Sequence, residues 1–353
     1  MISHISIGKR RIGLNEPVYI VAEISANHNQ DFEQAARLLQ AAKDAGADAV
    51  KFQTYTPDTM TIRSDRKHFR IDGSLWDGWT LYDLYAKAYT PWEWQPKLKE
   101  MAEKIGLDFL STPFDPMSVD FLDRMGVTAY KVASFEIVDL PLIEVLANTG
   151  KPLIISTGMA TLGEIEDAVQ AAQKGGTREI ALLKCTSAYP APPEEANLRT
   201  IPHLAEAFGL PVGLSDHTLG IAVPVAGVAL GACIVEKHFT LSRSNPGPDS
   251  AFSLEPPEFK AMVEAIRTTE KALGKVYYGV SEKEESSKVF RRSLFVVRDM
   301  RAGEVFTKEN VRSIRPGYGL PPKFLKDVLG RRVARDVTCG TPLSWELIGE
   351  RLD

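Results

Sequence analysis

The chain has 353 residues and a net charge of -4, with 44% hydrophobic and 25% charged residues. This composition is typical of a soluble globular protein long enough for one large domain and a small one. The weakly acidic balance gives no reason to expect nucleic acid or an anionic membrane as a partner. No apolar run approaches the roughly 18 residues that a membrane span needs.

The three cysteines, Cys185, Cys233 and Cys339, are far apart and odd in number. Such spacing predicts reduced thiols in a cytoplasmic protein rather than a disulfide framework. The first residues also lack the charged and apolar plan of a signal peptide.

Short apolar runs alternate with helical segments over roughly 270 residues, which is close to the length of a (β/α)8 barrel. Strands are predicted at 18–24, 49–53, 107–112, 129–132, 152–157, 180–184, 213–218 and 234–239. Helices are predicted between them, and a last helix covers about 257–273. Eight strand–helix units in this order predict an α/β fold, the (β/α)8 TIM barrel.

A long insertion interrupts this rhythm between Gln53 and Pro91. It contains Trp76, Trp79 and Tyr85, and long loops after barrel strands are often functional. These aromatic side chains either enclose part of a sugar-sized or acyl-bearing ligand or form a satellite hydrophobic cluster over the barrel wall.

The composition changes after Gly274. We expect a barrel domain at 1–275, a polar linker at 276–291 and a small, mainly β domain at 292–353. The small domain carries a basic, glycine-rich loop at 312–320, which includes Arg315. A solvated turn is the alternative interpretation of that loop.

Polar and ionisable residues end nearly every predicted barrel strand. In this fold the carboxyl ends of the strands carry the active site, and several charges at one rim are costly unless they are paired or bind a ligand. The rim residues are Glu23, Lys51, Gln53, Thr112, Lys131, Ser134, Ser156, Lys184, Ser215, Asp216, His217, Glu236 and His238.

The chemistry of these groups suggests an anionic, phosphorylated substrate. Lysines and hydroxyls suit phosphate oxygens, and Glu23 and Glu236 are candidate acid/base groups. A lone histidine is more often structural, but His217 and His238 end adjacent strands and together suggest a divalent metal.

Two reaction types fit this rim. One is a Schiff-base aldolase that uses a rim lysine. The other is metal-assisted carbon–carbon bond formation between a phosphorylated enol and an aldehyde, which the two histidines favour. A non-catalytic barrel that binds sugar acids is the alternative from another class, although a binding module has no use for this combination of groups.

Ordered motifs along nearly the whole chain resemble the sialic acid (nonulosonic acid) synthase family, whose members condense phosphoenolpyruvate with an N-acetylated amino sugar. The C-terminal segment resembles the antifreeze-like (SAF) domain of these synthases. The matching motifs lie at residues 22–28, 50–54, 111–114, 130–134, 156–159, 185–190, 213–218 and 236–239. The insertion, together with Lys184 and Ser187, resembles the pseudaminic acid branch, with the neuraminic and legionaminic acid branches as alternatives.

The resemblance implies a role for each matching residue. His217 and His238 would hold a divalent metal, Mn²⁺ first and Mg²⁺ or Co²⁺ as alternatives, which polarises the sugar aldehyde. Glu23, Glu236 and Asp216 are the implied catalytic or metal-ordering carboxylates. The implied phosphoenolpyruvate ligands are Lys51, Thr112, Lys131, Ser134, Ser156, Ser187 and Ser215.

The resemblance also implies how the sugar is bound and how two subunits cooperate. Gln53 and Tyr189 would order the sugar within one barrel. The family's small domain caps the partner subunit's barrel in a domain-swapped homodimer, and Arg315 would reach the neighbouring site to contact the sugar. The product would be used to modify flagellin or a surface polysaccharide.

Overall fold

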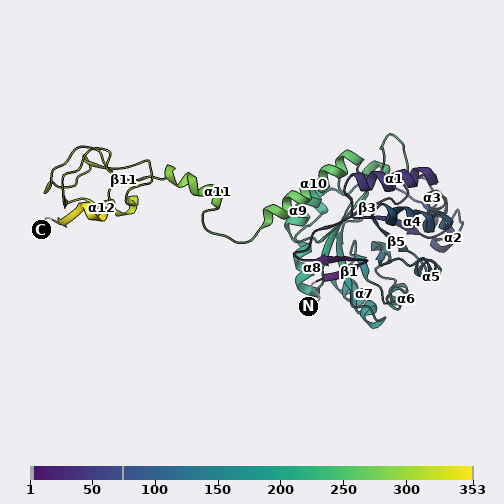
Figure 1. Ribbon diagram of the computed structural model, residues 1–353. Helices are drawn as coiled ribbons and strands as arrows, with labels where there is room; N and C mark the ends of the chain where they lie inside the picture. Colours follow the sequence, from purple (N-terminus) through teal and green to yellow (C-terminus); the bar gives the residue numbers. More distant parts are fainter. Residues whose placement is uncertain (1–3, 74, 352–353) are drawn as a thin grey trace. The chain divides into compact units, whose positions relative to one another are not determined.

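The computed structural model describes residues 4–73 and 75–351 (Figure 1). It divides into two compact units, one ending at Gly274 and the other beginning at Lys275. The first unit contains a closed barrel of parallel strands in the order β10-β3-β4-β5-β6-β7-β8-β9. The predicted (β/α)8 barrel is therefore confirmed. The barrel strands are β3 (Tyr19–Glu23), β4 (Ala49–Thr54), β5 (Asp108–Pro113), β6 (Tyr130–Val132), β7 (Leu153–Ser156), β8 (Ile180–Cys185), β9 (Val212–Asp216) and β10 (Ile234–His238).

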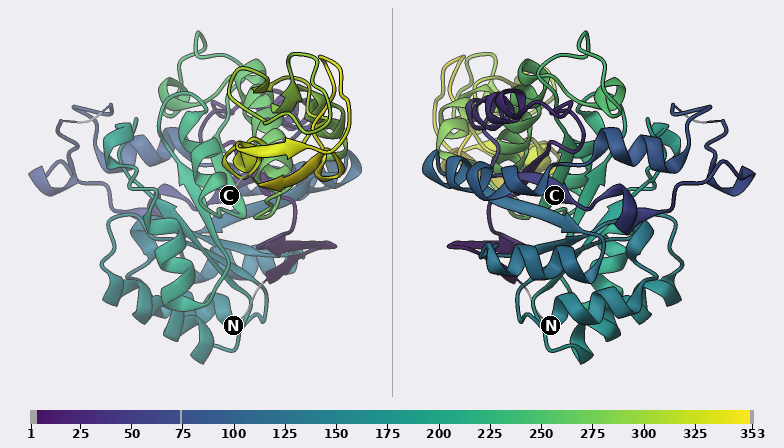
Figure 2. Two further views of the ribbon diagram at one scale, coloured as in Figure 1. Left: turned by 90° about the vertical axis from the view of Figure 1, so that its left-hand side faces the viewer. Right: turned by 90° about the vertical axis from the view of Figure 1, so that its right-hand side faces the viewer.

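Helices surround these strands, as the two side views show (Figure 2). Their ends follow local capping rules: the Asp31 side chain accepts from the backbone N–H groups of Glu33 and Gln34 and so begins the first helix. The main helices are α1 (Phe32–Asp44), α4 (Gln95–Lys104), α5 (Pro116–Arg124), α6 (Leu140–Ala147), α7 (Leu162–Lys174), α8 (Thr200–Phe208), α9 (Ala222–Ala229) and α10 (Pro256–Leu273). Within residues 4–73 and 75–351, no helix combines the length and apolarity needed to cross a membrane.

An antiparallel hairpin of β1 (His4–Ile7) and β2 (Arg10–Gly13) precedes the barrel. Its side chains Ile5, Ile7 and Ile12 are buried in one cluster with residues from the amino ends of the strands, such as Tyr19 and Ile234. The hairpin therefore closes the amino end of the barrel. This hairpin is not among the predicted strands, because a four-residue strand carries too little periodicity to be recognised.

The insertion after β4 contains the short helices α2 (Pro57–Met60) and α3 (Leu81–Ala88). Its aromatic side chains make two kinds of contact. Tyr85 packs edge-on against Tyr55, with 5.7 Å between ring centroids, as expected for a satellite cluster. Trp76 instead lies 5.9 Å from the ring of Tyr189, and its indole N–H donates to the Pro248 carbonyl at 3.0 Å.

The second unit contains a short helix, α11 (Glu282–Glu285), followed by a small β-rich core. The hairpin β11 (Ser293–Val296) and β12 (Val311–Ile314) and the pair β13 (Arg331–Val333) and β14 (Ile348–Arg351) are antiparallel. The helix α12 (Leu325–Val328) contributes Val328 to the buried cluster that includes Leu294 and Phe306. This unit has the predicted small, mainly β character.

Candidate active site at the barrel rim

Strand register brings the predicted rim residues together. His238 is the register partner of Glu23, and Glu23 is the partner of Lys51. On the other side of β10, Glu236 is the register partner of Ser215 on β9. Because residues two apart on a strand share a face, these side chains point to the same side of their strands and converge at the carboxyl end of the barrel.

Lys51 is the centre of a buried charged cluster. Its Nζ lies 2.8 Å from a Glu23 carboxylate oxygen and 3.8 Å from Glu236, and it donates to the Thr112 hydroxyl at 3.2 Å. The Ser215 hydroxyl donates to Glu236 at 3.0 Å. All five side chains are buried, so their interactions are stronger than the same contacts in water.

Their surroundings give the carboxyl groups of Glu23 and Glu236 different pKa values. Burial raises the pKa of Glu23 to about 7, and the nearby charge of Glu236 adds to this rise. Glu236 is also buried, but the charges of Lys131 and Lys51 outweigh burial and lower its pKa. Glu236 is therefore ionised at neutral pH while Glu23 can take up or release a proton, an arrangement typical of paired catalytic carboxylates. Gln53 orients Glu23 by donating to its second oxygen at 3.0 Å.

A second group of polar side chains forms around β6 and β7. Lys131 Nζ donates to the Ser156 hydroxyl at 2.6 Å, and burial lowers the pKa of this lysine. The backbone N–H of Gly158 donates to the Ser134 hydroxyl at 3.2 Å. A Cβ at Gly158 would stand 2.7 Å from that hydroxyl and also against Ser187, so the glycine lets both serines approach the backbone closely. Ammonium, hydroxyl and amide groups in one place suit a phosphate or carboxylate ligand.

The two predicted metal ligands lie beside each other, with 5.3 Å between the ring centroids of His217 and His238. Nδ1 of His217 donates to the Thr186 carbonyl at 2.9 Å, so Nε2 is the ring atom that could bind a metal. Nδ1 of His238 is buried and has no hydrogen-bond partner among the described residues. Burial lowers the pKa of His238 well below its usual value, so its ring is neutral and able to bind a metal.

These features fit a metal held by two imidazoles and completed by water or substrate. Within residues 4–73 and 75–351, no group of three or more His, Cys, Asp or Glu side chains is arranged to hold a metal by itself. Tyr189 and Phe252 enclose the histidines: the Tyr189 ring lies 4.5 Å from His217 and the Phe252 ring lies 4.8 Å from His238.

Asp216 is not part of the Lys51 cluster. Its carboxylate contacts Lys237 Nζ and accepts from the Thr218 hydroxyl at 3.0 Å. Since Ser215 points toward Glu236, the alternation of side chains along β9 turns Asp216 to the other side of the strand. Arg315 belongs to the second unit, where its side chain is exposed, and its role stays a prediction.

Sequence reasoning missed three residues near the histidines. Asp249 is buried, burial raises its pKa, and it accepts from the Ala26 N–H at 3.3 Å. Phe252 and the thiol of Cys185, 3.8 Å from His217 Nδ1, complete this group. Asp249 and Phe252 lie in the irregular segment after β10, where no strand period marks them; Cys185 ends β8 and could have been found by its register with Ser215.

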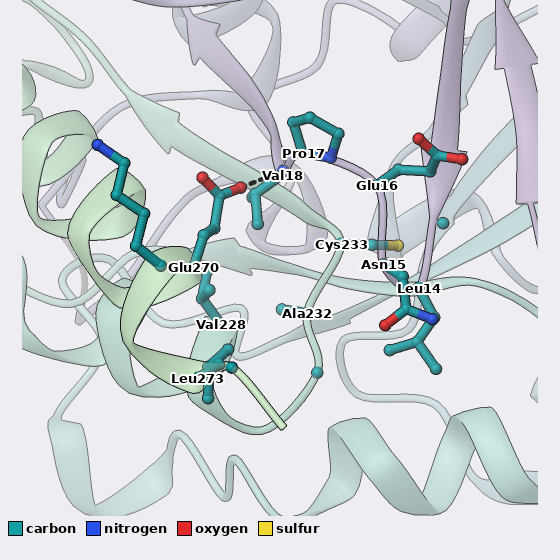
Figure 3. A pocket seen from close by; sticks show the side chains of 14 residues that line it. Leu14, Asn15, Glu16, Pro17, Val18, Val228, Ala232, Cys233, Glu270 and Leu273 are labelled. Carbon is teal, nitrogen blue, oxygen red and sulfur yellow. Dashed lines mark hydrogen bonds between the residues drawn. The ribbon is translucent and has the colours of Figure 1, made fainter. Parts of the chain in front are cut away.

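A separate pocket of about 440 Å³ lies at the amino ends of β3 and β10 (Figure 3). It is lined by residues that include Leu14, Val18, Val228 and Leu273, and none of the predicted site residues reaches it. The Glu270 carboxylate accepts from the backbone N–H of Val18 at 2.5 Å and so fastens α10 to β3. We regard this pocket as part of the packing of the amino end.

The barrel, the paired carboxylates and the lysine and hydroxyl groups define an enzyme of the TIM-barrel class with a site for an anionic substrate. Comparison with known families narrows the class. The NeuB family model matches residues 38–278 and the SAF domain model matches residues 291–348. The chain belongs to the NeuB family, which confirms the resemblance found in the sequence.

Individual relatives cover nearly the whole chain. Pseudaminic acid synthase of Helicobacter pylori is 47% identical over 96% of this chain and 99% of the relative. N,N'-diacetyllegionaminic acid synthase of Legionella pneumophila is 39% identical over 95% of this chain and 96% of the relative. The crystal structure of N-acetylneuraminic acid synthetase from Leptospira borgpetersenii, solved with citrate, has a TM-score of 0.72 and 34% identity, covering 80% of this chain and 94% of that one.

Proposed function

We propose that this chain is a pseudaminic acid synthase, which condenses phosphoenolpyruvate with 2,4-diacetamido-2,4,6-trideoxy-L-altrose to give pseudaminic acid and phosphate with C–O cleavage. The observation that carries the proposal is the 47% identity to a pseudaminic acid synthase, against 39% to a legionaminic acid synthase, over nearly the same share of the chain. The rim supports it, because it holds an anion site, two carboxylates of different acidity and two imidazoles.

In this proposal, phosphoenolpyruvate binds between Lys131 and Lys51, each with its neighbouring hydroxyl groups. Lys131, with Ser134, Ser156, Thr112 and Ser215, holds the phosphate. Lys51 and Ser187 hold the carboxylate. The buried hydroxyls and ammonium groups lose no further solvation when the anion enters, which favours a preorganised site.

The two histidines are proposed to hold a divalent metal, Mn²⁺ first and Mg²⁺ or Co²⁺ as alternatives. The His238 ring is neutral, and its Nδ1 has no hydrogen-bond partner in residues 4–73 and 75–351, which supports this role. When bound, such an ion supplies Lewis-acid polarisation of the sugar aldehyde.

Glu23, Glu236 and Asp216 are proposed to have three different roles. Glu23, with a pKa raised to about 7 by burial, takes a proton from the water that adds to C2 after the enol carbon has attacked the aldehyde. Glu236 stays ionised and balances the lysines. Asp216 acts through Lys237 on the strands that carry the histidines, so we propose it as a positioning residue.

The sugar is proposed to lie against Gln53 and Tyr189, with Trp76 extending the aromatic wall. The segment 292–353 is proposed as a cap, joined by the linker 276–291 to the barrel 1–275. In a domain-swapped homodimer the cap would bring Arg315 to the partner's sugar. The pseudaminic acid would be made in the cytoplasm, where phosphoenolpyruvate is available, and used to glycosylate flagellin or a surface polysaccharide.

The experiment is a phosphate-release assay with phosphoenolpyruvate and Mn²⁺, comparing 2,4-diacetamido-2,4,6-trideoxy-L-altrose, the legionaminic acid precursor and N-acetylmannosamine. We expect a strong preference for the altrose sugar. A preference for either other sugar would keep the reaction and overturn the branch. Release without any sugar, or no release with all three, would overturn the synthase proposal.

The metal is tested separately by removing it. Chelation should abolish turnover, and Mn²⁺ should restore it. His217→Ala and His238→Ala should each abolish turnover and also weaken Mn²⁺ binding measured by calorimetry, a readout independent of activity. His203→Ala, on the outer helix α8, is the matched control and should change neither. Full activity in the presence of chelator would contradict the metal assignment.

A further inference from the structure

Ser25 lies in the turn that follows β3 and has a backbone conformation that suits glycine. Its φ is 46°, in the left-handed region, where a side chain crowds the backbone and glycine alone is free of strain. The residue is also buried, with only 5% of its surface exposed. Strained residues of this kind persist where the surrounding structure holds them, and they are concentrated at functional sites.

The contacts around Ser25 hold the turn in this conformation. The backbone N–H of Asn27 donates to the Ile24 carbonyl at 3.0 Å and closes the turn. The Asn27 side-chain amide donates to the Phe239 carbonyl and to the Ser253 hydroxyl, both at 2.9 Å. These bonds do not involve the Ser25 side chain, so glycine could occupy the position with less strain. The presence of a serine therefore points to its hydroxyl group.

The Ser25 hydroxyl bonds to two side chains at the barrel rim. It hydrogen-bonds to the carboxyl of Asp249, which also accepts from the Ala26 N–H at 3.3 Å. Burial raises the pKa of Asp249 and the Ser25 contact opposes the rise, as expected when a hydroxyl donates to a carboxylate. A hydroxyl has one hydrogen to donate, so its oxygen meets the Nε2 of Gln53, at 2.8 Å, as an acceptor.

These contacts orient the Gln53 side chain. Its Nε2 donates to Ser25 Oγ at 2.8 Å and to the Glu23 carboxylate at 3.0 Å. A side-chain amide has two N–H hydrogens and one oxygen, so both hydrogens are used inside the protein. Within the part of the chain that the structure describes, the amide oxygen has no such partner. It is left to accept a hydrogen bond from a ligand.

We propose that Ser25 is a positioning residue for sugar specificity; this inference rests on the proposed function. Its hydroxyl holds the Gln53 amide in one of two orientations, with Nε2 toward Ser25 and Glu23 and with the oxygen available to the substrate. Recognition by Gln53 then requires a hydrogen-bond donor on the sugar, either a hydroxyl or an acetamido N–H. A sugar without a donor at this place leaves the amide oxygen unpaired and binds more weakly.

Removing the hydroxyl loosens this orientation. Without the Ser25 acceptor, the Gln53 amide keeps one of its two hydrogen bonds, the one to Glu23. The oxygen and nitrogen ends of an amide have nearly the same shape, so the group can turn over within the same space. A turned amide offers N–H groups where the sugar needs an acceptor, and one hydrogen bond to the sugar is lost.

The test compares Ser25→Gly and Ser25→Ala with the wild type by phosphate release with Mn²⁺, using whichever of the three sugars the wild type prefers. Both variants lack the hydroxyl, but only alanine keeps the strain of the positive φ. We expect the KM for the sugar to rise about tenfold in both, with little change in the KM for phosphoenolpyruvate. The midpoint of thermal unfolding should be higher for Ser25→Gly than for Ser25→Ala.

A cycle of single and double variants tests whether Ser25 acts through Gln53. Gln53→Ala alone should raise the KM for the sugar, and adding Ser25→Gly should raise it no further. Asn15→Gly is the matched control, because Asn15 is an exposed residue with a φ of 69° at the amino end of the barrel. It makes the same kind of backbone change far from the rim and should leave both KM values as in the wild type.

An unchanged KM for the sugar in either Ser25 variant would overturn the proposal. So would equal rises in the KM values for sugar and phosphoenolpyruvate, which indicate a general disturbance of the site. Additive effects of the Ser25 and Gln53 changes would also overturn it, since the serine would then act without the amide. A wild-type protein that releases no phosphate with any of the three sugars contradicts the proposed function instead, so the two failures are distinguishable.

Discussion

Lys237 on β10 and Asp216 on β9 are register partners, and their side chains form an ion pair that is almost completely removed from solvent. Lys237 Nζ also contacts the Thr218 carbonyl. Each member lies next to a predicted metal ligand, His238 or His217. The pair therefore fixes the register of the two strands and, with it, the spacing of the histidines.

Replacing Asp216 with asparagine should destabilise the fold, because the Lys237 ammonium would stay buried without its counter-charge. Breaking a buried pair in this way costs about 3 kcal/mol or more, measurable by urea unfolding. Mn²⁺ binding should weaken in parallel. Asp120→Asn, which removes an exposed pair with Arg124, should cost far less. Equal unfolding free energies for the two variants would contradict this account.

The close approach of Gly158 to two serines predicts a specific effect on phosphoenolpyruvate. The Cβ of Gly158→Ala would displace Ser134 and Ser187, and small misplacements of binding groups can reduce activity strongly. We expect KM for phosphoenolpyruvate to rise about tenfold with little change in Mn²⁺ binding. Gly163→Ala, where a Cβ meets nothing within 4 Å, is the control. An unchanged KM would show that these serines do not hold the substrate.

The raised pKa of Glu23 predicts how stability changes with pH. The folded chain holds a proton on Glu23 between the ordinary value of 4.5 and about 7, whereas the unfolded chain has released it. Its contribution to the free energy of unfolding therefore decreases as pH rises through this window and is constant above it.

Glu23→Gln should lack this decrease. Denaturant unfolding of both proteins across about pH 5 to 8 measures the difference, which should grow in favour of the variant as pH rises. Glu236 does not interfere, because its lowered pKa places its own effect at lower pH. Parallel curves for wild type and variant would mean that Glu23 titrates as an ordinary carboxyl.

The swapped-cap proposal predicts complementation between an impaired variant and an inactive variant. Arg315→Ala should weaken sugar use without unfolding the chain, and His217→Ala should be inactive. In a mixed dimer, one barrel with intact histidines would receive an intact Arg315 from its partner. Random exchange of subunits should then restore roughly a quarter of wild-type activity. No recovery after verified exchange would contradict a cap that acts on the partner.

The sequence predicted the barrel and most of the rim because both follow from short-range rules. Apolar runs of strand length predicted the strands. The polar residues at the ends of these runs were then predicted to form the site, among them Glu23, Lys51, Lys131, His217 and His238. What it could not give is the direction of each side chain. Asp216 and Glu236 look alike as acidic residues near strand ends, yet register turns Asp216 toward Lys237.

The structural features that were not predicted from the sequence share one physical reason. Asp249 and Phe252 lie in the segment that follows β10, where no strand period marks a residue as inward or outward. The hairpin at 4–13 was missed for the related reason that its strands have only four residues each. Long-range packing, rather than local pattern, places all of these groups.

The hairpin has a practical consequence. Ile5, Ile7 and Ile12 pack against the amino ends of the barrel strands, at the end opposite to the predicted site residues. A surface tether attached at the N-terminus would hold the molecule by its closed base. An enzyme immobilised in this way would keep the carboxyl ends of its strands turned away from the support, whereas removal of the hairpin would expose the apolar side chains that it covers.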